Sequence, residues 1–267
     1  MQHRARKRFG QNFLHDPGVI KRIVTAIAPG PDQHLVEVGP GRGAITRLLL
    51  EAAGRLDAVE LDRDLIEPLT RECAHLGRLE IISADALRFD FCGLAKAGER
   101  LRLVGNLPYN ISTPLLFHLL GQKRCIEDMH FMLQKEVVER MAAEPGSKTF
   151  GRLSVMLQVH CEVIPLFDIG PGAFRPAPKV VSSLVRLRPW AEPPHAIADP
   201  DGFARLVNQA FSQRRKTLRN SLRDWLAPER MQQLGIDPGQ RPERLEVADF
   251  VSLANAAAAD TSAGKDG

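Results

Sequence analysis

The sequence predicts an α/β fold, in which strands alternate with helices, followed by a small helical domain at the C-terminus. Short apolar runs recur along the first part of the chain, and segments with helical periodicity separate them. The first of these strands leads directly into a glycine-rich turn and a helix. After a proline-containing break near residues 189–194, the apolar residues follow helical spacing only. We therefore expect one domain over residues 1–191, a second over 192–255, and a disordered tail of small and polar residues over 256–267.

The composition is that of a soluble globular protein that is long enough to bury an α/β core. Of its 267 residues, 44% are hydrophobic and 25% are charged. A net charge of +4, a pI near 9.0 and local clusters of Arg and Lys are compatible with a polyanionic partner. No run approaches the ~20 apolar residues of a membrane span. Four widely spaced cysteines predict neither a zinc site nor a disulfide, and they fit a reducing cytoplasm best: Cys73, Cys92, Cys125 and Cys161.

The chain begins with a basic arm that leads into a helix. An arm of this kind is usually a solvated terminus, although beside a nucleic-acid site it would bind phosphates. Asp16 and Pro17 are typical of a helix start, and the pattern predicts a helix over residues 17–27. The cations of the arm are Arg4, Arg6, Lys7 and Arg8.

The apolar strand over residues 34–38 leads into the glycine-rich turn, and a helix with regular apolar spacing follows the turn. Glycines let a ligand approach the backbone closely, and the helix start directs amide groups at it. Gly39, Gly41 and Ala44 match the dinucleotide pattern G-x-G-x-x-A, and an acid, Glu60, follows about twenty residues later. The turn alone therefore leaves both a nicotinamide dinucleotide and S-adenosylmethionine open as the ligand.

Polar side chains also follow the next three strands, which we expect over residues 56–61, 79–86 and 101–104. Glu60 ends the first of them, where a carboxylate can accept both hydroxyls of a ribose. Asp85 ends the second and could accept an adenine amino group, although an acid in that place is often only a helix cap. Asn106 ends the third. Because ligands bind beyond the carboxyl ends of such strands, the ordered set predicts a nucleoside site at this edge.

The segment Asn106-Leu107-Pro108-Tyr109 offers an amide, a carbonyl on a proline-fixed turn and a flat ring. These are the groups needed to hold an amino group on a planar base. Taken alone, the four residues fit an ordinary turn with a structural tyrosine equally well. A helix follows, for which Thr113 and Pro114 are the expected start.

The last part of the chain contains a proline-rich loop and a cluster of cations. The loop over residues 171–179 lies between two expected strands, 162–168 and 180–187, and could hold Phe174 against a ligand. Two apolar helical patterns follow, near residues 203–211 and 218–226. The dense cations beside the second pattern favour phosphate binding over a merely solvated face. They are Arg214, Arg215, Lys216, Arg219 and Arg223.

Six motifs together resemble the ribosomal RNA adenine dimethyltransferase family, and most closely its bacterial members that act on small-subunit (16S) rRNA. The likeness extends from Phe9 to about Arg223, and only the glycine turn among the motifs is generic. The motifs are Gln11-Asn12-Phe13-Leu14, residues 37–43 (EVGPGRG), Asn106-Leu107-Pro108-Tyr109, residues 151–155 (GRLSV), residues 174–180 (FRPAPKV) and residues 211–218 (FSQRRKTL).

The resemblance implies a Rossmann-like class I methyltransferase fold, with a mostly parallel seven-stranded sheet and a small α-helical C-terminal domain that binds rRNA. It implies S-adenosylmethionine as cofactor, with S-adenosylhomocysteine as product and no metal. The expected reaction is dimethylation of N6 on two adjacent adenosines in a hairpin near the 3′ end of small-subunit rRNA, during small-subunit biogenesis. The implied cofactor-binding residues are Asn12, Leu14, Gly39, Gly41, Glu60, Asp85 and Asn106, and the implied catalytic residues are Asn106, Leu107, Pro108, Tyr109 and Phe174.

Several alternatives remain at this stage. A large-subunit rRNA adenine methyltransferase has a similar catalytic half, and a non-catalytic RNA-binding ribosome assembly factor would keep the fold without the reaction. A DNA adenine methyltransferase lacks support, because no segment resembles a DNA target-recognition domain. An NAD oxidoreductase would leave residues 106–109 unexplained. The expected partner is small-subunit rRNA in a precursor subunit, and the expected protein is a cytoplasmic monomer without membrane contact.

Overall fold

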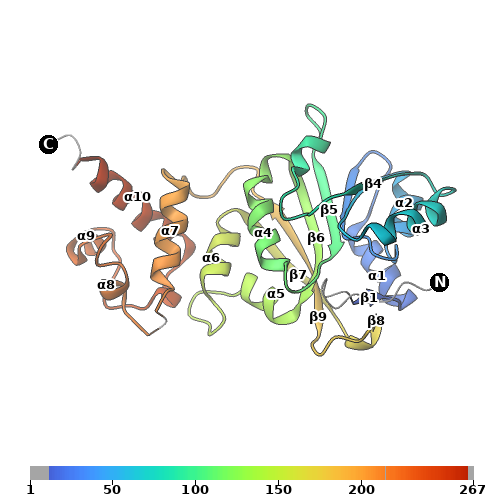
Figure 1. Cartoon of the computed structure of the whole chain (residues 1–267). Coiled ribbons are helices and arrows are strands. Elements are labelled where there is room, and N and C mark those ends of the chain that lie inside the picture. Colours follow the sequence, from blue (N-terminus) through green and yellow to red (C-terminus); the bar gives the residue numbers. More distant parts are fainter. Residues whose placement is uncertain (1–11, 214, 264–267) are drawn as a thin grey trace. The chain divides into compact units, whose positions relative to one another are not determined.

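The computed structural model describes residues 12–213 and 215–263, which form two compact units (Figure 1). Of these residues, the first unit contains 12–138 and 164–189, and the second contains 139–163, 190–213 and 215–263. The second unit thus includes residues 139–163, which the sequence analysis assigns to the first domain. The predicted basic arm and Arg214 lie outside the described residues. None of the described helices has the length and apolar character needed to cross a membrane.

The first unit is built on a seven-stranded sheet, which confirms the predicted mixed α/β class. Five strands run parallel, and β9 pairs with β6 in the antiparallel sense. The parallel strands end at one edge, where the polar residues predicted from the sequence follow them. The strand order is β4 (Arg78–Ser83), β3 (Arg55–Glu60), β2 (His34–Val38), β5 (Leu101–Asn106), β6 (Ile126–Gln134), β9 (Ser182–Pro189) and β7 (Cys161–Ile169).

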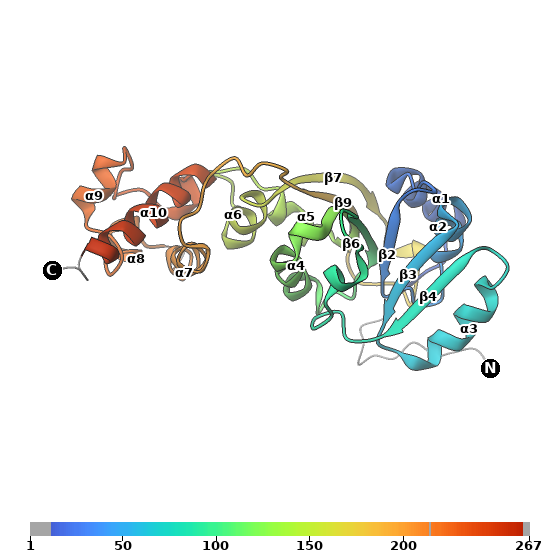
Figure 2. The same cartoon turned by 90° about the horizontal axis from the view of Figure 1, so that it is seen from above.

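Helices cover both faces of this sheet (Figure 2). On one face α1 (Pro17–Ile27), α2 (Thr46–Ala53) and α3 (Arg63–Cys73) pack their apolar sides against the strands in one buried cluster. The opposite face is covered by α4 (Ser112–Gly121). As predicted, Asp16 caps α1, and its carboxylate accepts from the Val19 amide at 2.9 Å. The expected cap at Thr113 is wrong, because α4 already begins at Ser112.

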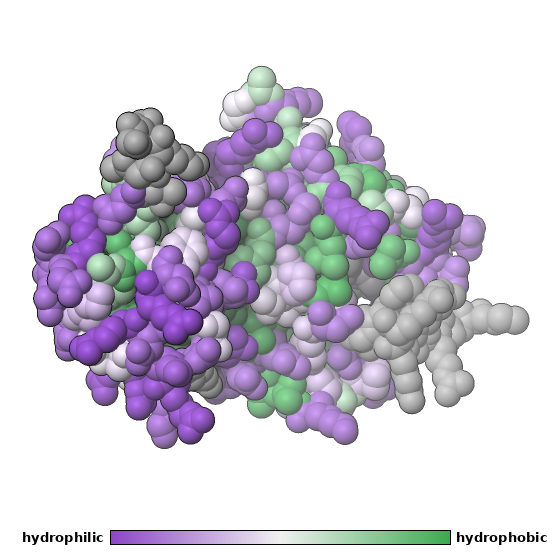
Figure 3. Space-filling view, turned by 60° about the vertical axis from the view of Figure 1, so that its left-hand side comes forward, coloured by the Kyte–Doolittle hydropathy of each residue, from purple (hydrophilic) through white to green (hydrophobic). Residues whose placement is uncertain are grey.

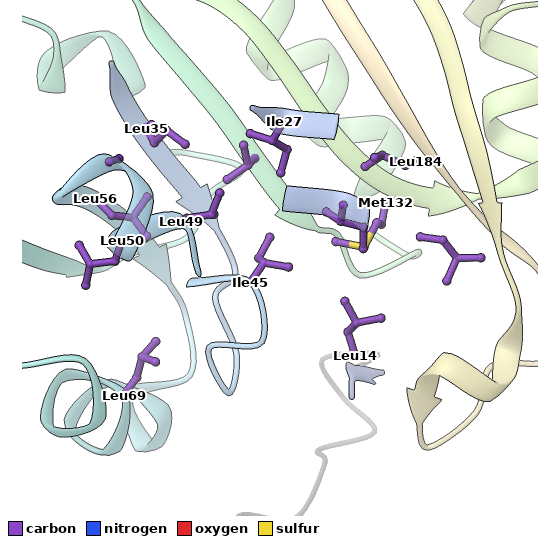
Figure 4. Packing of buried hydrophobic residues seen from close by; sticks show 14 of the residues in the cluster. Leu14, Ile27, Leu35, Ile45, Leu49, Leu50, Leu56, Leu69, Met132 and Leu184 are labelled. Carbon is purple, nitrogen blue, oxygen red and sulfur yellow. The ribbon is translucent and has the colours of Figure 1, made fainter. Parts of the chain in front are cut away.

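A second, two-stranded sheet joins the start of the described chain to the proline-rich loop. In it β1 (Phe13–Leu14) pairs antiparallel with β8 (Phe174–Arg175), which follows the short 3-10 helix η4 (Pro171–Ala173). Leu14 and Phe174 are buried in the same apolar cluster as α1, α2 and α3. Figure 4 shows Leu14 pointing from β1 toward Met132. The pairing fixes residues 12–14 beside the carboxyl edge of the main sheet.

At the other edge of the main sheet, a buried arginine ties two strands to a helix end. Arg102 on β5 forms a two-bond ion pair with Asp128 on β6, at 3.0 Å from Nε and 2.9 Å from Nη2. Its guanidinium also donates to the carbonyls of Ile27 and Ala28 at the end of α1, and to Gln33 Oε1. Burial opposes ionisation of Asp128, but His130 and Arg102 hold the pKa of its carboxyl below the usual value. Arg102 thereby satisfies carbonyls that α1 itself leaves unpaired.

Two 3-10 helices, η2 (Phe91–Leu94) and η3 (Lys123–Cys125), bring together cysteines that are distant in sequence. Cys92 and Cys125 form a disulfide with a Cα–Cα distance of 5.5 Å, although 33 positions separate them. The expectation that no cysteines pair is therefore wrong, because the pairing depends on tertiary folding and not on a local Cys-x-x-Cys spacing. Cys73 and Cys161 are both buried.

The second unit is helical, as the sequence predicts for its C-terminal part. Phe211 lies between Phe150 and Phe250, with ring centroids 6.3 and 5.5 Å away. The face of this unit that Figure 3 shows is largely hydrophilic. Its helices are the end of α5 (Lys135–Met141), then α6 (Arg152–Gln158), α7 (Pro200–Ala210), α8 (Leu218–Ser221), α9 (Pro228–Gln233), η5 (Pro242–Arg244) and α10 (Val247–Ala263).

Two elements of this unit differ from prediction. The helix expected near residues 218–226 is only the four-residue α8, whose first amides, of Leu218 and Arg219, bond the loop carbonyls of Gln240 and Pro238. Beyond Ser221 the chain continues in turns. The disordered tail expected from residue 256 is helical to Ala263, the end of α10. Alanine has the highest helix propensity, and the alanine-rich segment 256–259 continues the helix that Phe250 anchors in the core.

Candidate active site

The carboxyl edge of the main sheet forms a pocket of about 280 Å³ within the first unit. The glycine turn, the ends of β3 and β4, the end of β5 and the β1 segment all contribute to its lining. The predicted residues that it brings together are Asn12, Leu14, Gly39, Gly41, Glu60, Asp85, Asn106, Leu107, Pro108 and Tyr109. Residues dispersed over almost one hundred positions therefore share one site.

The glycine turn passes close to its neighbours. Gly39 and Gly41 have φ values of +69° and +57°, a conformation that other residues rarely adopt. A Cβ at Gly41 would lie only 3.3 Å from the ring of Phe13, which also lines the pocket. The Arg42 guanidinium lies 4.5 Å from the centroid of the same ring. The turn and the β1 segment thus form one continuous wall of the pocket.

Glu60 fixes the turn to the end of β3. Its carboxylate accepts from the amide of Gly41 at 3.1 Å and from the amide of Asp62 at 2.8 Å. Burial raises the pKa of Glu60, while these backbone hydrogen bonds oppose the rise. Each carboxylate oxygen can accept more than one hydrogen bond, so Glu60 still has capacity for a ligand hydroxyl.

Asp85 has the local role that its position at a strand end suggests, and it also faces the pocket. Its Oδ1 accepts from the amide of Leu87 at 3.0 Å, which stabilises the turn after β4. Ala84, Ala86 and Leu87 line the pocket beside it. The acid is therefore both a turn-forming residue and part of the pocket wall.

Asn106 is oriented by the β1 segment. Its Nδ2 donates to the carbonyl of Asn12 at 2.9 Å, so Oδ1 is the atom of this amide that can accept from a ligand. Gly105, which precedes it, allows β5 to approach β2 closely, since a Cβ there would lie 2.5 Å from the carbonyl oxygen of Val38. The amide of Leu107 donates to the carbonyl of Met132 at 3.3 Å. These contacts fix the backbone that presents Oδ1 and the Leu107 carbonyl.

Tyr109 is half-buried at the pocket and bonded at both ends. Its phenol oxygen lies 2.7 Å from Ser182 Oγ, and its backbone carbonyl accepts from Ser112 Oγ at 3.0 Å. Burial raises the pKa of Tyr109, and the hydrogen bond with Ser182 opposes the rise. Ser182 has no local sequence signal, because the contact joins residues 73 positions apart.

The structure does not bring Phe174 to the pocket. Its side chain is 2% exposed, is absent from the pocket lining and packs in the apolar cluster beside Leu14. In the short strand β8 the alternation of side chains directs Phe174 inward, while Arg175 is exposed. The expectation that Phe174 holds a ligand therefore does not fit this geometry, and its observed contacts are those of a core residue.

Glu37 is a pocket residue to which the sequence analysis assigns no role. It is 1% exposed, and its Oε2 accepts from the hydroxyl of Thr46 at 2.6 Å. Burial, with a further contribution from the charge of Glu60, raises the pKa of Glu37 to about 8 against the opposing Thr46 hydrogen bond. The available signal was a glutamate among the apolar residues that follow His34 in this strand.

The proton held by Glu37 should make stability depend on pH. The native protein binds a proton that the unfolded chain releases above pH 4.5, so stability should fall as pH rises from about 4.5 to about 8. Glu37 can contribute at most about 1.4 kcal/mol per pH unit to this decrease in the free energy of unfolding, and Glu37→Gln should remove that contribution. Urea unfolding at pH 5.5 and pH 8 measures it, with the exposed Glu51→Gln as matched control. An unchanged pH dependence in Glu37→Gln would show that Glu37 is not protonated.

The predicted cations within the second unit are exposed, in agreement with a surface role. Arg215 and Lys216 precede α8, Arg219 lies on it, and Arg223 follows it. Arg223 pairs with the neighbouring Asp224 at 3.6 Å, with both side chains largely exposed. Such a pair contributes little to stability and leaves the guanidinium accessible.

Comparison with known proteins identifies the family of this chain. Residues 2–259 match the family model described as ribosomal RNA adenine dimethylase. The chain is 59% identical over 254 residues to the ribosomal RNA small subunit methyltransferase A of Pseudomonas aeruginosa, and the match covers 95% of each chain. It is 56% identical over 253 residues to the protein of the same name from Hahella chejuensis, with 95% of this chain and 93% of that one covered.

Two solved structures are similar over nearly the whole chain. A dimethyladenosine transferase from Plasmodium falciparum gives a TM-score of 0.77 at 25% identity, covering 90% of this chain and 95% of that one. The 23S rRNA methyltransferase ErmE gives a TM-score of 0.74 at 25% identity, and the match covers 92% of this chain and 100% of that one. These matches agree with the mixed α/β fold and its seven-stranded sheet. The chain belongs to the ribosomal RNA adenine dimethylase family.

Proposed function

We propose that this protein dimethylates N6 of two adjacent adenosines in a hairpin near the 3′ end of small-subunit rRNA. The observation that carries the proposal is the single pocket in which the glycine turn, two strand-end acids and the Asn106-Leu107-Pro108-Tyr109 segment meet. The small-subunit target is favoured over the large-subunit alternative by relatives at 55–59% identity that are named small subunit methyltransferases.

The residues of the pocket fit S-adenosylmethionine. Gly41 provides a cradle that a Cβ would fill, and Glu60 and Asp85 offer carboxylates for the ribose and the adenine. Asn12 and Leu14 would contact the methionine part near Gly39. When bound, this cofactor supplies an electrophilic methyl group. The nicotinamide alternative remains unsupported, because it gives no role to the segment after β5.

Asn106 and Leu107 would prepare the target amine. The lone pair of adenine N6 is delocalised into the ring, which makes it a weak nucleophile. Asn106 Oδ1 and the Leu107 carbonyl would each accept one N6–H bond, drawing the nitrogen toward a tetrahedral shape in which the lone pair is available. The Nδ2 of Asn106 donates to the carbonyl of Asn12, and the amide of Leu107 donates to the carbonyl of Met132, so both residues are held in place. Alignment of the reacting groups contributes at best about 7–11 kcal/mol to lowering the barrier.

Tyr109 would stack on the target base after the adenosine leaves its helix or loop. A stacking contact of this kind is typically worth ~1–3 kcal/mol. Pro108 restricts the backbone before the ring, and the hydrogen bonds at Oη and at the carbonyl hold it in place. The second face of the base would meet a group other than Phe174 in the described conformation.

The exposed cations around α8 would bind rRNA phosphates. Arg219→Ala combined with Arg223→Ala should weaken rRNA binding and lower the slope of log affinity against log salt by roughly 1.4–1.8, since each lost contact accounts for about 0.7–0.9. Titration of labelled rRNA at several salt concentrations measures this. Arg63→Ala with Arg124→Ala, two exposed arginines of the first unit, is the control. If the wild type and the α8 variant show equal slopes of log affinity against log salt, these arginines do not bind rRNA phosphates.

One transfer assay tests the proposed function. Labelled S-adenosylmethionine is incubated with undermethylated small-subunit particles, large-subunit RNA and DNA, and the modified adenines are mapped. We expect label on two adjacent adenosines of small-subunit rRNA alone, as N6,N6-dimethyladenosine. Label in large-subunit RNA would favour that alternative. Transfer to none of the substrates would favour a non-catalytic assembly factor.

The setting of the reaction is part of the proposal. We expect a monomer that acts in the cytoplasm on a precursor of the small subunit during its biogenesis. The Cys92–Cys125 disulfide is unusual for that compartment, where most thiols are kept reduced. Gel filtration of the reduced and oxidised protein would establish the oligomeric state in both forms.

A further inference from the structure

We propose that Ser182 is a positioning residue whose hydroxyl fixes the ring of Tyr109 in the orientation that stacks on the target adenosine. The inference rests on the proposed function, since it assigns the base to Tyr109. It goes beyond the family motif residues predicted from the sequence, because Ser182 lies on an antiparallel strand and does not line the pocket.

The hydrogen bond that carries the proposal is short, and its Ser182 partner is buried. Tyr109 Oη and Ser182 Oγ are 2.7 Å apart, and Ser182 is 1% exposed. Because Ser182 is buried, water cannot easily reach its hydroxyl, and the phenol of the half-buried Tyr109 satisfies it. Among the described residues, the hydroxyl of Ser182 bonds the phenol of Tyr109.

Ser182 itself is rigid, because it belongs to the main sheet. It is the first residue of β9 and lies opposite Gln134 of β6 in register. The amide of Lys135 donates to the carbonyl of Val181 at 2.9 Å, which extends the pairing by one residue. A hydroxyl on such a strand is a fixed reference point for a side chain that bonds it.

The other end of Tyr109 is held independently. Ser112 Oγ donates to its carbonyl, and the amide of Ile111 donates to the carbonyl of Pro108 at 3.1 Å. With the backbone held, only the two side-chain torsions of Tyr109 remain, and the bond to Ser182 restrains both. The ring is thus ordered before the base arrives, so binding does not have to order it.

This bond can be followed by ultraviolet absorbance, because Tyr109 is the only tyrosine in the sequence. The absorbance of ionised phenol near 295 nm therefore titrates this one side chain. Burial raises the pKa of Tyr109 and the bond to Ser182 counters the rise, so loss of the bond should raise the phenol pKa further. This readout needs neither RNA nor cofactor.

The experiment compares Ser182→Ala, Tyr109→Phe and the double variant with the wild type. Ser183→Ala is the matched control, because this neighbour on β9 is 3% exposed and bonds Asp168 instead. We expect Ser182→Ala to raise the phenol pKa and to lower kcat/KM for undermethylated particles about tenfold. Binding of S-adenosylmethionine should be unchanged. The double variant should be no worse than Tyr109→Phe alone, since both single changes remove the same bond.

Stacking can be followed separately in an RNA hairpin that carries 2-aminopurine at the target position. Quenching of its fluorescence on binding should be weaker with Ser182→Ala than with the wild type or Ser183→Ala. Unchanged quenching and unchanged kcat/KM, alongside a shifted phenol pKa, would overturn the proposal and leave the bond with a purely structural role. If the wild type transfers no methyl group, the proposed function is wrong, but titration of the Tyr109 phenol still tests the hydrogen bond to Ser182.

Discussion

Replacing Asn106 with alanine is expected to lower the rate of methyl transfer about 10²- to 10³-fold. The change removes Oδ1, which we propose accepts from the target amine as its charge develops. Removal of one preorganised hydrogen-bonding group from an active site typically has an effect of this size. It also removes the contact with the Asn12 carbonyl that orients the residue. Single-turnover transfer to undermethylated particles, at saturating cofactor, measures the rate.

The control for this variant is Asn208→Ala, an exposed asparagine on α7 in the second unit. It should transfer methyl groups at the wild-type rate. Unfolding midpoints of both variants show whether the loss is one of folding. If Asn106→Ala is folded and still transfers at more than one tenth of the wild-type rate, Oδ1 is not an essential acceptor.

Replacing Arg102 with alanine is expected to reduce stability by about 3–5 kcal/mol, because it removes the two-bond arginine partner of the largely buried Asp128 and leaves only His130 beside that carboxylate among the described residues. It also frees the carbonyls of Ile27 and Ala28 at the end of α1. For a protein of this size the loss corresponds to a fall in Tm of roughly 6–20 °C. Thermal and urea unfolding of the first unit measure it.

Arg71→Ala provides a matched comparison, since Arg71 forms an ion pair with Glu67 on the surface of α3. That pair is exposed and should contribute only about 0.3–0.5 kcal/mol. Combining Arg102→Met with Asp128→Leu should recover part of the stability lost in Arg102→Ala, because no unpaired charge remains. Equal losses for Arg102→Ala and Arg71→Ala would contradict the assigned role of burial.

The features that the sequence predicts correctly are those with a local physical signal. A strand followed by glycines, or by a single acid, is readable because the carboxyl ends of parallel strands share one edge. Glu60, Asp85 and Asn106 were brought together on this basis, and the structure places all three at the pocket. The Asp16 cap of α1 is equally local, because cap and amide lie three residues apart.

The features that the sequence does not predict depend on tertiary contacts. The Cys92–Cys125 bridge and the Tyr109–Ser182 bond join distant segments, and no spacing rule indicates either. Phe174 was expected at the ligand because its loop is rigid, but the pairing of β8 with β1 directs it into the core. The helical apolar pattern near residues 218–226 yields only the four-residue α8, which turns follow.

The pairing of β1 with β8 affects the order in which the protein folds during translation. Asn12 and Leu14 line the pocket, yet the strand that fixes them contains Phe174 and Arg175. A nascent chain is synthesised from its N-terminus, so β1 cannot pair until β8 has been made, whereas the five parallel strands are already available to fold. The ligand pocket is therefore completed late, and a nascent chain that stops before residue 174 contains the five parallel strands without a finished site.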